Sequence, residues 1–531
     1  MKNHSHRITF CLNVSLYPLR FEMASTIPIT LVDTHTTIQS NYDDGGIHTD
    51  PTKEESDTQY LVTWEVDDLG NPKSSPLWYK VWTVFVMSFG ATVVSLYSTS
   101  YTPSLPGIEA EFEVSKMVGL LGVTTYLLGM AVGSLIVAPL SEIYGRRPVY
   151  VVTMGLFTLL IIPCGLARNM EAILVSRFFG AFFGSAMMTN AAGTVSDIIS
   201  PEYIPLAYSF WGIGPINGPV IGPIIGGFVF EYLGWRWNNW LVMIMSFAAF
   251  IALIVAKETY GPRILRQRAA AKRKETGNDE WWSQHDDSSS FAQVLKTNIT
   301  RPIVMLVTEP ICIFWDVYVA LVYGVLYLCF VAYPLAFQQE RGWSSGMTGL
   351  AYCGIGVGAM IIILAEPLLR RFINSHPKDP KTGQVSPEAA VSIVCIGGVL
   401  LAVGQLWFAW TCTKDIHWIV PILAGVPFGA GNACVFIYAI SYLVRSYDVY
   451  AASAASGNAV LRSIMGGCLP LAGPSLYASL GLRWGGTLLG LLEAACIPIP
   501  VVFYFYGHKI RARSRMVQMI AKSREEDIRD V

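Results

Sequence analysis

The chain has 531 residues, of which 53% are hydrophobic and 14% are charged, with a mean hydropathy of +0.44. A soluble protein carries about 25% charged residues, so an ordinary soluble domain is excluded, and the net charge of −1 says nothing about partners. None of the ten cysteines forms a Cys-x-x-Cys pair, which excludes a disulfide framework and a zinc site.

The first 79 residues differ from the rest of the chain. Residues 1–79 are polar, rich in Thr, Asp and Ser, and lack helical periodicity, which predicts a mostly disordered N-terminal tail. The weakly apolar run 8–19 is not followed by an Ala-x-Ala site, so we reject a signal peptide there. Met1 and Met23 are both candidate start residues.

Long apolar blocks follow this tail. A membrane-spanning helix needs about 20 apolar residues, and about twelve blocks reach that length. They lie near 81–102, 117–139, 149–168, 172–197, 205–231, 236–256, 303–336, 346–368, 389–411, 417–444, 452–478 and 483–505. We therefore predict an all-α membrane protein with twelve transmembrane helices. Six of them lie in 80–256 and six in 302–506, with a linker loop at 257–301 and a basic tail at 507–531.

Short motifs recur in the two sets of six blocks. Gly234-Trp-Arg-Trp237 and Gly481-Leu-Arg-Trp484 each precede a long apolar block. A duplicated set of helices predicts two pseudo-symmetric halves with a substrate site between them, the usual construction of a secondary transporter. If the N-terminus is cytoplasmic, about 23 Lys and Arg residues beyond the first block fall on the cytoplasmic side and about 6 outside. This distribution predicts that both termini are cytoplasmic.

The linker is strongly basic. Its cations are Arg263, Arg266, Arg268, Lys272, Arg273 and Lys274. One interpretation is an amphipathic helix on the inner leaflet. The other, which we favour, is a solvated basic loop that follows the excess of positive charge on the cytoplasmic side.

A sixteen-residue motif runs from Gly133 to Pro148. It ends in Ser141-Glu-Ile-Tyr-Gly-Arg-Arg-Pro148, where Gly145 permits a tight turn. The motif resembles the loop 2–3 signature of the major facilitator superfamily, in the form of its fungal twelve-span drug:proton antiporter group. The resemblance implies a cytoplasmic gate that locks the inward-closed state. The implied gate residues are Glu142, Arg146, Arg147 and, as a charge partner, Asp197. A plain topology signal is the alternative.

The fifth block contains a regular glycine–proline pattern. Gly214, Gly218, Gly222 and Gly226 recur every four residues, so one helix face lacks side chains and a partner helix can pack closely against it. The same motif contains Pro215, Pro219, Pro223 and Gly227, and the prolines permit bending where neighbours satisfy the freed backbone groups. The motif resembles the antiporter motif of the exporter branches of the superfamily, which implies export. Ordinary small-residue packing is the alternative.

Two charged residues within the blocks suggest function, because a charge inside a membrane span is costly. Exporters that this chain resembles carry an arginine at the place of Arg177, which implies a part in proton coupling. The alternative is that Arg177 lies only about 8 Å into the span and snorkels to the outer interface.

The second charge is Asp316, about 13 residues into the block 303–336 and so near mid-membrane. Tyr323 and Tyr327 fall on its face of the helix, so the three residues would form an acidic aromatic site for protons or an organic cation. A structural hydrogen bond to another helix is the alternative reading of Asp316.

Other stretches extend the resemblance over about 450 residues and resemble the fungal polyamine and multidrug exporters. They include Tyr97-Ser-Thr-Ser-Tyr-Thr-Pro103 and Glu258-Thr-Tyr260. We therefore expect a secondary transporter that exports small organic molecules (drugs, toxins, secondary metabolites or polyamines) by proton antiport with alternating access. A proton-coupled nutrient importer is the alternative. By family analogy, the polar residues of the cavity wall are Ser98, Thr99, Asn190, Asp316, Tyr323 and Asn432.

An ATP site is not expected, because the chain has no Gly-x-x-x-x-Gly-Lys-[Ser/Thr] loop, and enzymatic activity is not expected, because signatures such as His-Glu-x-x-His are absent. The resemblance implies no cofactor and no metal, and the proton gradient is the energy source. The expected partners are the lipid bilayer and a small-molecule substrate, without nucleic acid, for a monomeric protein. The expected location is the plasma membrane, with the vacuolar membrane as the alternative.

Overall fold

The computed structural model describes residues 60–65, 68, 70–200, 203–284, 286, 291–378 and 385–520. These residues contain helices and loops but no strand, apart from two isolated bridges between Leu61 and Trp282 and between Lys378 and Val385. The predicted all-α class is therefore confirmed. Residues 1–59, most of the predicted tail, lie outside the described residues.

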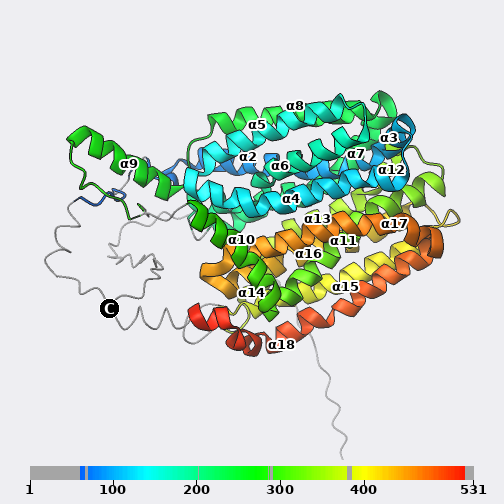
Figure 1. The fold of residues 1–531 in the computed structure, drawn as a ribbon. Helices are drawn as coiled ribbons and strands as arrows, with labels where there is room; N and C mark the ends of the chain where they lie inside the picture. The colour runs from blue at the N-terminus through cyan, green and yellow to red at the C-terminus, as the bar shows by residue number, and fades with distance from the viewer. Residues whose placement is uncertain are drawn as a thin grey trace, which may run out of the picture. The chain divides into compact units, whose positions relative to one another are not determined.

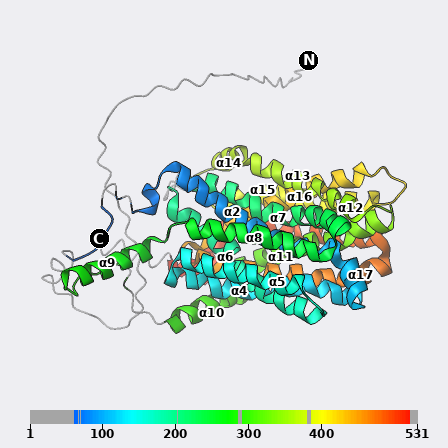
Figure 2. The same ribbon diagram turned by 90° about the horizontal axis from the view of Figure 1, so that it is seen from above.

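The N-terminal half contains six long helices. They are α2 (Leu77–Thr99), α4 (Lys116–Tyr144), α5 (Arg146–Gly165), α6 (Met170–Ile198), α7 (Ile204–Leu233) and α8 (Trp235–Val255). Short helices are η1 (Pro72–Ser74), η2 (Thr102–Ser104) and α3 (Leu105–Phe112). After α8 comes α9 (Gly261–Thr276), which projects from one end of the helix bundle in two perpendicular views (Figures 1 and 2). We call this the linker end; α3 and α12 lie at the opposite end.

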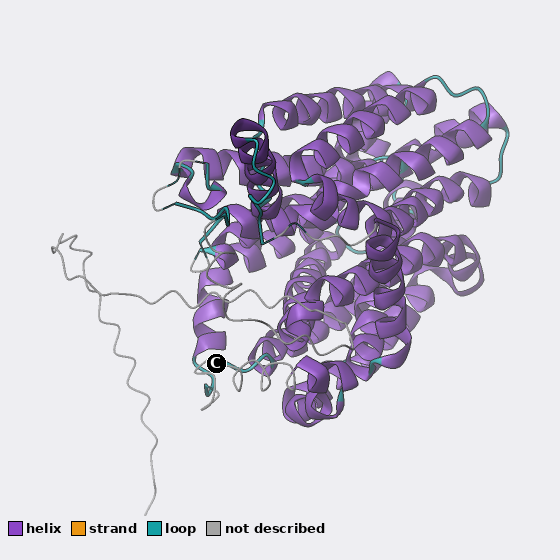
Figure 3. Cartoon of the chain, turned by 60° about the vertical axis from the view of Figure 1, so that its left-hand side comes forward, coloured by secondary structure: helices purple, strands orange, loops and turns teal. Residues whose placement is uncertain are grey.

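The C-terminal half is divided into more helices than the N-terminal half. Figure 3, coloured by secondary structure, shows that helices form the bundle. Its elements are α10 (Phe291–Thr308), α11 (Pro310–Pro334), η3 (Leu335–Gln339), α12 (Ser345–Ala351), α13 (Cys353–Leu364), α14 (Glu366–Asn374), α15 (Glu388–Thr411), α16 (Ile419–Tyr447), η4 (Asp448–Tyr450), α17 (Ala451–Cys496) and α18 (Pro498–Arg513).

Eleven stretches of the described chain are long and apolar enough to span a membrane, and the last of them runs from Ala451 to Arg513. Gly481 interrupts that stretch with φ 70°. Counting the helices before and after Gly481 separately gives the twelve predicted spans. Gly234, at the matching place of the N-terminal half, also has a positive φ of 85°, so the repeated Gly-x-Arg-Trp motif forms a tight turn in both halves.

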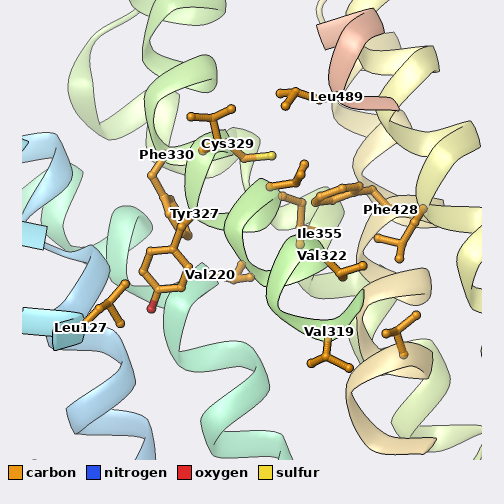
Figure 4. Close-up of a cluster of buried hydrophobic side chains, with 14 of the residues drawn as sticks. Leu127, Val220, Val319, Val322, Tyr327, Cys329, Phe330, Ile355, Phe428 and Leu489 are labelled. Carbon is orange, nitrogen blue, oxygen red and sulfur yellow. The ribbon is translucent and has the colours of Figure 1, made fainter. Parts of the chain in front are cut away.

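One apolar core crosses the boundary between the halves. Leu127 of α4 and Val220 of α7 belong to the same cluster of buried side chains as Tyr327 of α11 and Ile355 of α13, and Figure 4 shows these four residues together. The helices that meet across the boundary are mainly α4 with α17, and α7 with α12 and α13.

Three predicted boundaries need correction. The predicted tail 1–79 extends too far, because α2 begins at Leu77 and the Val62 amide donates a 2.9 Å hydrogen bond to the Trp282 carbonyl. The predicted block 303–336 is broken at Glu309, which has φ −95° and ψ 113° between α10 and α11, because a residue before proline disfavours the helical conformation. The predicted tail 507–531 begins too early, since α18 continues to Arg513.

The favoured loop interpretation of the linker 257–301 is also wrong. Its residues include α9 and the first turns of α10. The apolar side of α9 does not remain open, since Leu265 and Ala269 are buried against Val62 with Trp64 and Trp281 beside them. Burial of these side chains supplies the packing that a helix of this length needs to be stable in water.

Candidate functional site

The glycine pattern of α7 faces α2. A Cβ atom built on Gly218 would lie 2.5 Å from the Ser95 Cβ and 3.1 Å from the Thr92 carbonyl oxygen of α2. The other ladder glycines of α7, Gly214, Gly222 and Gly226, also face α2 or the residue that follows it. The predicted close approach of a partner helix is therefore present, and the partner is α2. Gly227 faces the other half instead, where a Cβ would lie 2.5 Å from the Ser345 carbonyl oxygen.

Hydroxyl groups of α2 complete the backbone hydrogen bonding of α7. Pro215 and Pro223 have no N–H, so the carbonyls four residues earlier lose their helical donors. The Ser88 hydroxyl donates to the Trp211 carbonyl at 3.1 Å, and the Thr99 hydroxyl donates to the Pro219 carbonyl at 2.9 Å. Such side-chain donors are how a membrane helix tolerates proline.

This pairing corrects one predicted wall residue. Thr99 is fully buried between α2 and α7, so it holds two helices of one half together and does not line a cavity. The predicted role failed because neighbouring residues of a helix point about 100° apart, so that Ser98 and Thr99 face different helices.

Arg177 of α6 is enclosed by aromatic rings. Only 1% of its surface is exposed, and its guanidinium carbon lies 4.8 Å, 4.3 Å and 4.9 Å from the ring centroids of Tyr97, Tyr101 and Tyr126. Its Nε donates to the Gly122 carbonyl at 2.7 Å. The alternative that Arg177 snorkels to the membrane surface is therefore wrong. Its Nη1 has no hydrogen-bond partner among the described residues.

A polar chain crosses the boundary between the halves. The hydroxyls of Ser98 in α2 and Tyr327 in α11 lie 2.8 Å apart, and the Tyr323 hydroxyl donates to Tyr327 at 3.3 Å. The Arg462 guanidinium carbon of α17 lies 5.0 Å from the Tyr323 ring centroid and 4.7 Å from that of Phe436. Only 7% of Arg462 is exposed, and its Nε has no hydrogen-bond partner among the described residues.

Asp316 lies elsewhere than predicted. It comes six residues after the first residue of α11, about 9 Å along the helix, so it is not near the middle of the span. Its Oδ1 accepts a 2.9 Å hydrogen bond from Asn458 of α17, while its Oδ2 has no partner among the described residues. Tyr323, seven residues on, lies about 10 Å further along the helix and contacts Arg462 instead.

The predicted site that combines Asp316 with Tyr323 and Tyr327 is therefore wrong. The two tyrosines do lie together, with ring centroids 4.8 Å apart, but the cation beside them is an arginine of the chain itself. The error follows from the unrecognised break at Glu309, which moved the start of the span by seven residues.

The two asparagines predicted for the cavity wall form few side-chain hydrogen bonds. Asn190 of α6 is 2% exposed, and its Nδ2 has no hydrogen-bond partner in the described part of the chain. Asn432 of α16 is half-buried, and its Nδ2 donates to the Phe428 carbonyl of its own helix at 3.4 Å. Their place in a cavity wall remains a prediction.

The predicted gate pair is formed at the linker end. Arg146 Nε donates to Asp197 Oδ2 at 3.2 Å, and Arg146 Nη1 donates to the Ser141 hydroxyl at 2.6 Å. The Tyr260 ring centroid lies 5.1 Å from the Arg146 guanidinium carbon. Because burial raises the pKa of Tyr260 to about 12, the phenol that faces this arginine stays neutral.

Glu258 is the member of this network that sequence reasoning missed. Its Oε1 accepts hydrogen bonds from the backbone N–H groups of Arg146 at 2.9 Å and of Tyr260 at 3.0 Å. By contrast, the Glu142 side chain is exposed and forms no ion pair with a described residue, and its gate role stays a prediction. Arg147 is exposed and donates to the Ile254 carbonyl at 2.8 Å. The motif Glu258-Thr-Tyr260 was the available signal for Glu258.

A family model described as Major Facilitator Superfamily matches residues 87–467, more than half of the 531 residues. The chain belongs to the major facilitator superfamily. This assignment indicates a multi-pass membrane transporter, and it confirms the fold predicted from the duplicated helices.

Relatives of this superfamily member are fungal, which confirms the resemblance to the fungal group. The ascochitine biosynthesis cluster MFS transporter of Didymella fabae is 39% identical over 463 residues, which cover 86% of this chain and 89% of the relative. The MFS-type efflux pump MFS2 of Trichophyton rubrum is 39% identical over 461 residues, which cover 86% and 77%. A partially occluded, inward-open structure of the E. coli xylose transporter XylE has a TM-score of 0.58 at 13% identity, covering 81% of this chain and 98% of that one. That likeness shows the fold alone.

Proposed function

We propose that this superfamily member exports small organic molecules by proton antiport. The two halves would rock so that a site between them opens to one side of the membrane at a time. The observation that carries the proposal is the contact of α7 with α2. There the glycine ladder of α7, and the carbonyls that its prolines leave without helical donors, are matched by Ser88, Thr92, Ser95 and Thr99 of α2. The ladder resembles the exporter motif, and here it has a specific helix partner. Relatives named as efflux pumps support the same direction.

The orientation that we propose places the linker end in the cytoplasm. In the described part of the chain the cations at the opposite end are Lys116, Arg168, Arg236, Arg341, Lys414 and Arg483. More of the Lys and Arg residues lie at the linker end, including those of α9 and of the last turns of α18. An excess of Lys and Arg marks the cytoplasmic side. We place the protein in the plasma membrane, with the vacuolar membrane as the second possibility.

The substrate site that we propose lies at the boundary between the halves, beside Ser98, Tyr327, Tyr323 and Arg462. The rings of Tyr323 and Tyr327 offer flat apolar faces. The Tyr327 hydroxyl can give up its hydrogen bond with Ser98 and form one with a substrate instead. Because this hydrogen bond joins α2 to α11 across the boundary, a substrate that replaces it would loosen the contact between the halves. Binding at this point can therefore be coupled to the rocking motion.

Asp316 is the proton carrier that we propose. An ionised carboxylate without a partner is costly in an apolar setting, so the buried Oδ2 is best occupied by a proton while the site stays dry. Water that reaches Asp316 when the linker end opens would accept that proton. Asn458 would then hold the remaining carboxylate through the bond to Oδ1.

The gate network would hold the linker end of the N-terminal half together during transport. Arg146 joins the start of α5 to the end of α6 through Asp197, and Glu258 joins the segment after α8 to the same point. These bonds close the linker end of the N-terminal half into one rigid unit. Rocking of the whole half then carries α2 and α7 with it.

Efflux from yeast that lacks its own multidrug pumps tests the proposal. Cells that express the chain should lose several labelled compounds faster than empty-vector cells, and a protonophore should abolish the gain. Asp316→Asn should abolish proton-driven efflux while keeping substrate binding, because the amide preserves shape but cannot exchange a proton at neutral pH. Glu493→Gln is the matched control. The Glu493 carboxyl is as deeply buried as that of Asp316, and its oxygens have no hydrogen-bond partner among the described residues.

The outcomes separate the alternatives. Faster accumulation of a compound would make the chain an importer. Loss of proton-driven efflux in Glu493→Gln but not in Asp316→Asn would move the proton site to the last span. A gain in efflux that survives the protonophore would contradict proton antiport.

A further inference from the structure

A cavity of about 310 Å³ opens at the linker end between α5, α8 and α9. This volume falls in the range of small-ligand sites, about 300–1,000 Å³. Its polar lining includes Arg147, Glu258 and Arg263, and its apolar lining includes Pro148, Val151 and Ile254. None of its lining residues belongs to the C-terminal half or to the group of Ser98, Tyr327, Tyr323 and Arg462, so the proposed transport pathway does not use it.

The polar wall of the cavity contains an arginine with an unsatisfied hydrogen-bond donor. Arg263 Nη1 is buried and has no hydrogen-bond partner among the described residues, and the same is true of Glu258 Oε2. These two atoms lie 3.7 Å apart, too far for a hydrogen bond. Because Glu258 Oε1 is already bound to backbone N–H groups, Arg263 can turn to a better acceptor without leaving Glu258 unpaired. With Arg147 the three charged groups sum to +1, which favours an anion.

The apolar wall continues onto surface that faces the bilayer. Val151 and Ile254 belong to α5 and α8, whose neighbouring side chains Val152, Ile251 and Val255 are 58%, 45% and 70% exposed. Exposed aliphatic side chains on a membrane span contact acyl chains. The cavity therefore combines two arginines with apolar side chains of two membrane-spanning helices.

We propose that this cavity binds an anionic phospholipid. The phosphate would bond to Arg263 and Arg147, and an acyl chain would lie along α5 and α8. A free phosphate ion would use the cations but not the apolar wall, and a zwitterionic lipid would gain less from the net positive charge. Since Arg263 lies beside Glu258, and Glu258 accepts a hydrogen bond from the backbone of the gate residue Arg146, the lipid would be linked to Arg146 through two side chains, those of Arg263 and Glu258.

Lipid retention by the purified full chain tests this site. The chain is placed in nanodiscs of phosphatidylcholine with a minor fraction of phosphatidylserine, released into detergent, and the retained lipids are counted by native mass spectrometry. Wild type should retain phosphatidylserine in preference to phosphatidylcholine. Arg147→Gln and Arg263→Gln should each lower that retention about fivefold, the contribution of one basic side chain near an anionic lipid surface.

Two further variants keep the test decisive. Val151→Trp fills the cavity without changing charge and should also lower retention. Arg370→Gln removes an arginine of the other half that is paired with Glu366 of its own helix, and it should retain lipid as wild type does. All variants are compared only after gel filtration and melting show a folded protein.

Three results would overturn the proposal. The first is equal retention of the two lipids by wild type. The second is unchanged retention in the double variant of Arg147 and Arg263. The third is complete displacement of phosphatidylserine by inorganic phosphate, which would mean that the site recognises a free phosphate group and not a lipid.

Discussion

Gly218 is the position where the packing of α7 on α2 can be tested most directly. Substitution by alanine adds one Cβ atom, which would lie 2.5 Å from the Ser95 Cβ. Two carbon atoms in contact prefer a separation of about 3.5–4.0 Å. The helices would therefore have to separate by about 1 Å at this point, because the Thr92 carbonyl oxygen at 3.1 Å prevents a simple sideways shift.

The cost of Gly218→Ala can be worked out from these contacts. Overpacking in a well-packed core costs about 1–3 kcal/mol. Separation of the helices also stretches the hydrogen bonds from Ser88 and Thr99 to α7, and a hydrogen bond between membrane helices contributes about 0.6 kcal/mol on average. The higher helix propensity of alanine compared with glycine offsets about 1 kcal/mol of this loss. The expected net loss is about 1–3 kcal/mol.

Thermal unfolding of the purified protein in detergent measures this loss, with Gly212→Ala as the control on the same helix. A Cβ on Gly212 would meet only the Ile216 Cδ1, at 3.8 Å, so that variant should be as stable as wild type or slightly more stable. Gly218→Ala should melt several degrees lower, at about 2–4 °C per kcal/mol for domains of 150–250 residues. Equal melting temperatures for the two variants would refute the close contact of α7 with α2.

Substitutions at three other contacts give further predictions. Thr99→Val removes the donor to the Pro219 carbonyl and should cost about 1 kcal/mol in a melting experiment, whereas Thr99→Ser should melt like wild type. Arg146→Gln and Asp197→Asn each leave a mostly buried charge unpaired, so the double variant should be more stable than the sum of the single losses predicts. The hydrogen bond from Arg268 holds the pKa of Asp68 below its usual value, so the contact of this segment with α9 should be kept above about pH 4 and lost as the pH falls further. Hydrogen-exchange protection in α9, taken relative to the intrinsic exchange rate at each pH, measures this loss, and Asp68→Asn should make that protection independent of pH.

The features that sequence alone predicted are those that depend on local periodicity. Glycines at intervals of four must share one face of a helix, so the groove of α7 was predictable, although its partner α2 was not. The turn glycines Gly234 and Gly481 were recognisable because the same tetrapeptide pattern precedes a long apolar block in each half.

The missed features depend on contacts between distant segments. The acceptor role of Glu258 requires the backbone of Arg146, which is 112 positions away in the chain, and no spacing rule connects the two. The break at Glu309 carried a local signal, since a residue before proline avoids the helical conformation. The continuous apolar character on both sides concealed it. That single error misplaced Asp316 along the membrane normal.

The two buried arginines show why the C-terminal half is the better place to seek substrate binding. Arg177 donates to three carbonyls, those of Tyr97, Ser98 and Gly122, and is surrounded by three tyrosine rings. These contacts satisfy most of its donors within one half, so its charge stabilises the packing of α2, α4 and α6.

Arg462 has two aromatic rings beside it, and its Nε has no acceptor among the described residues. An unsatisfied buried donor costs free energy until a partner arrives. The ring of Tyr323 places this cation next to the Tyr327–Ser98 bond that joins the halves. Under the proposed function, a substrate that supplies an acceptor to Arg462 would recover that energy beside a hydrogen bond that joins the halves.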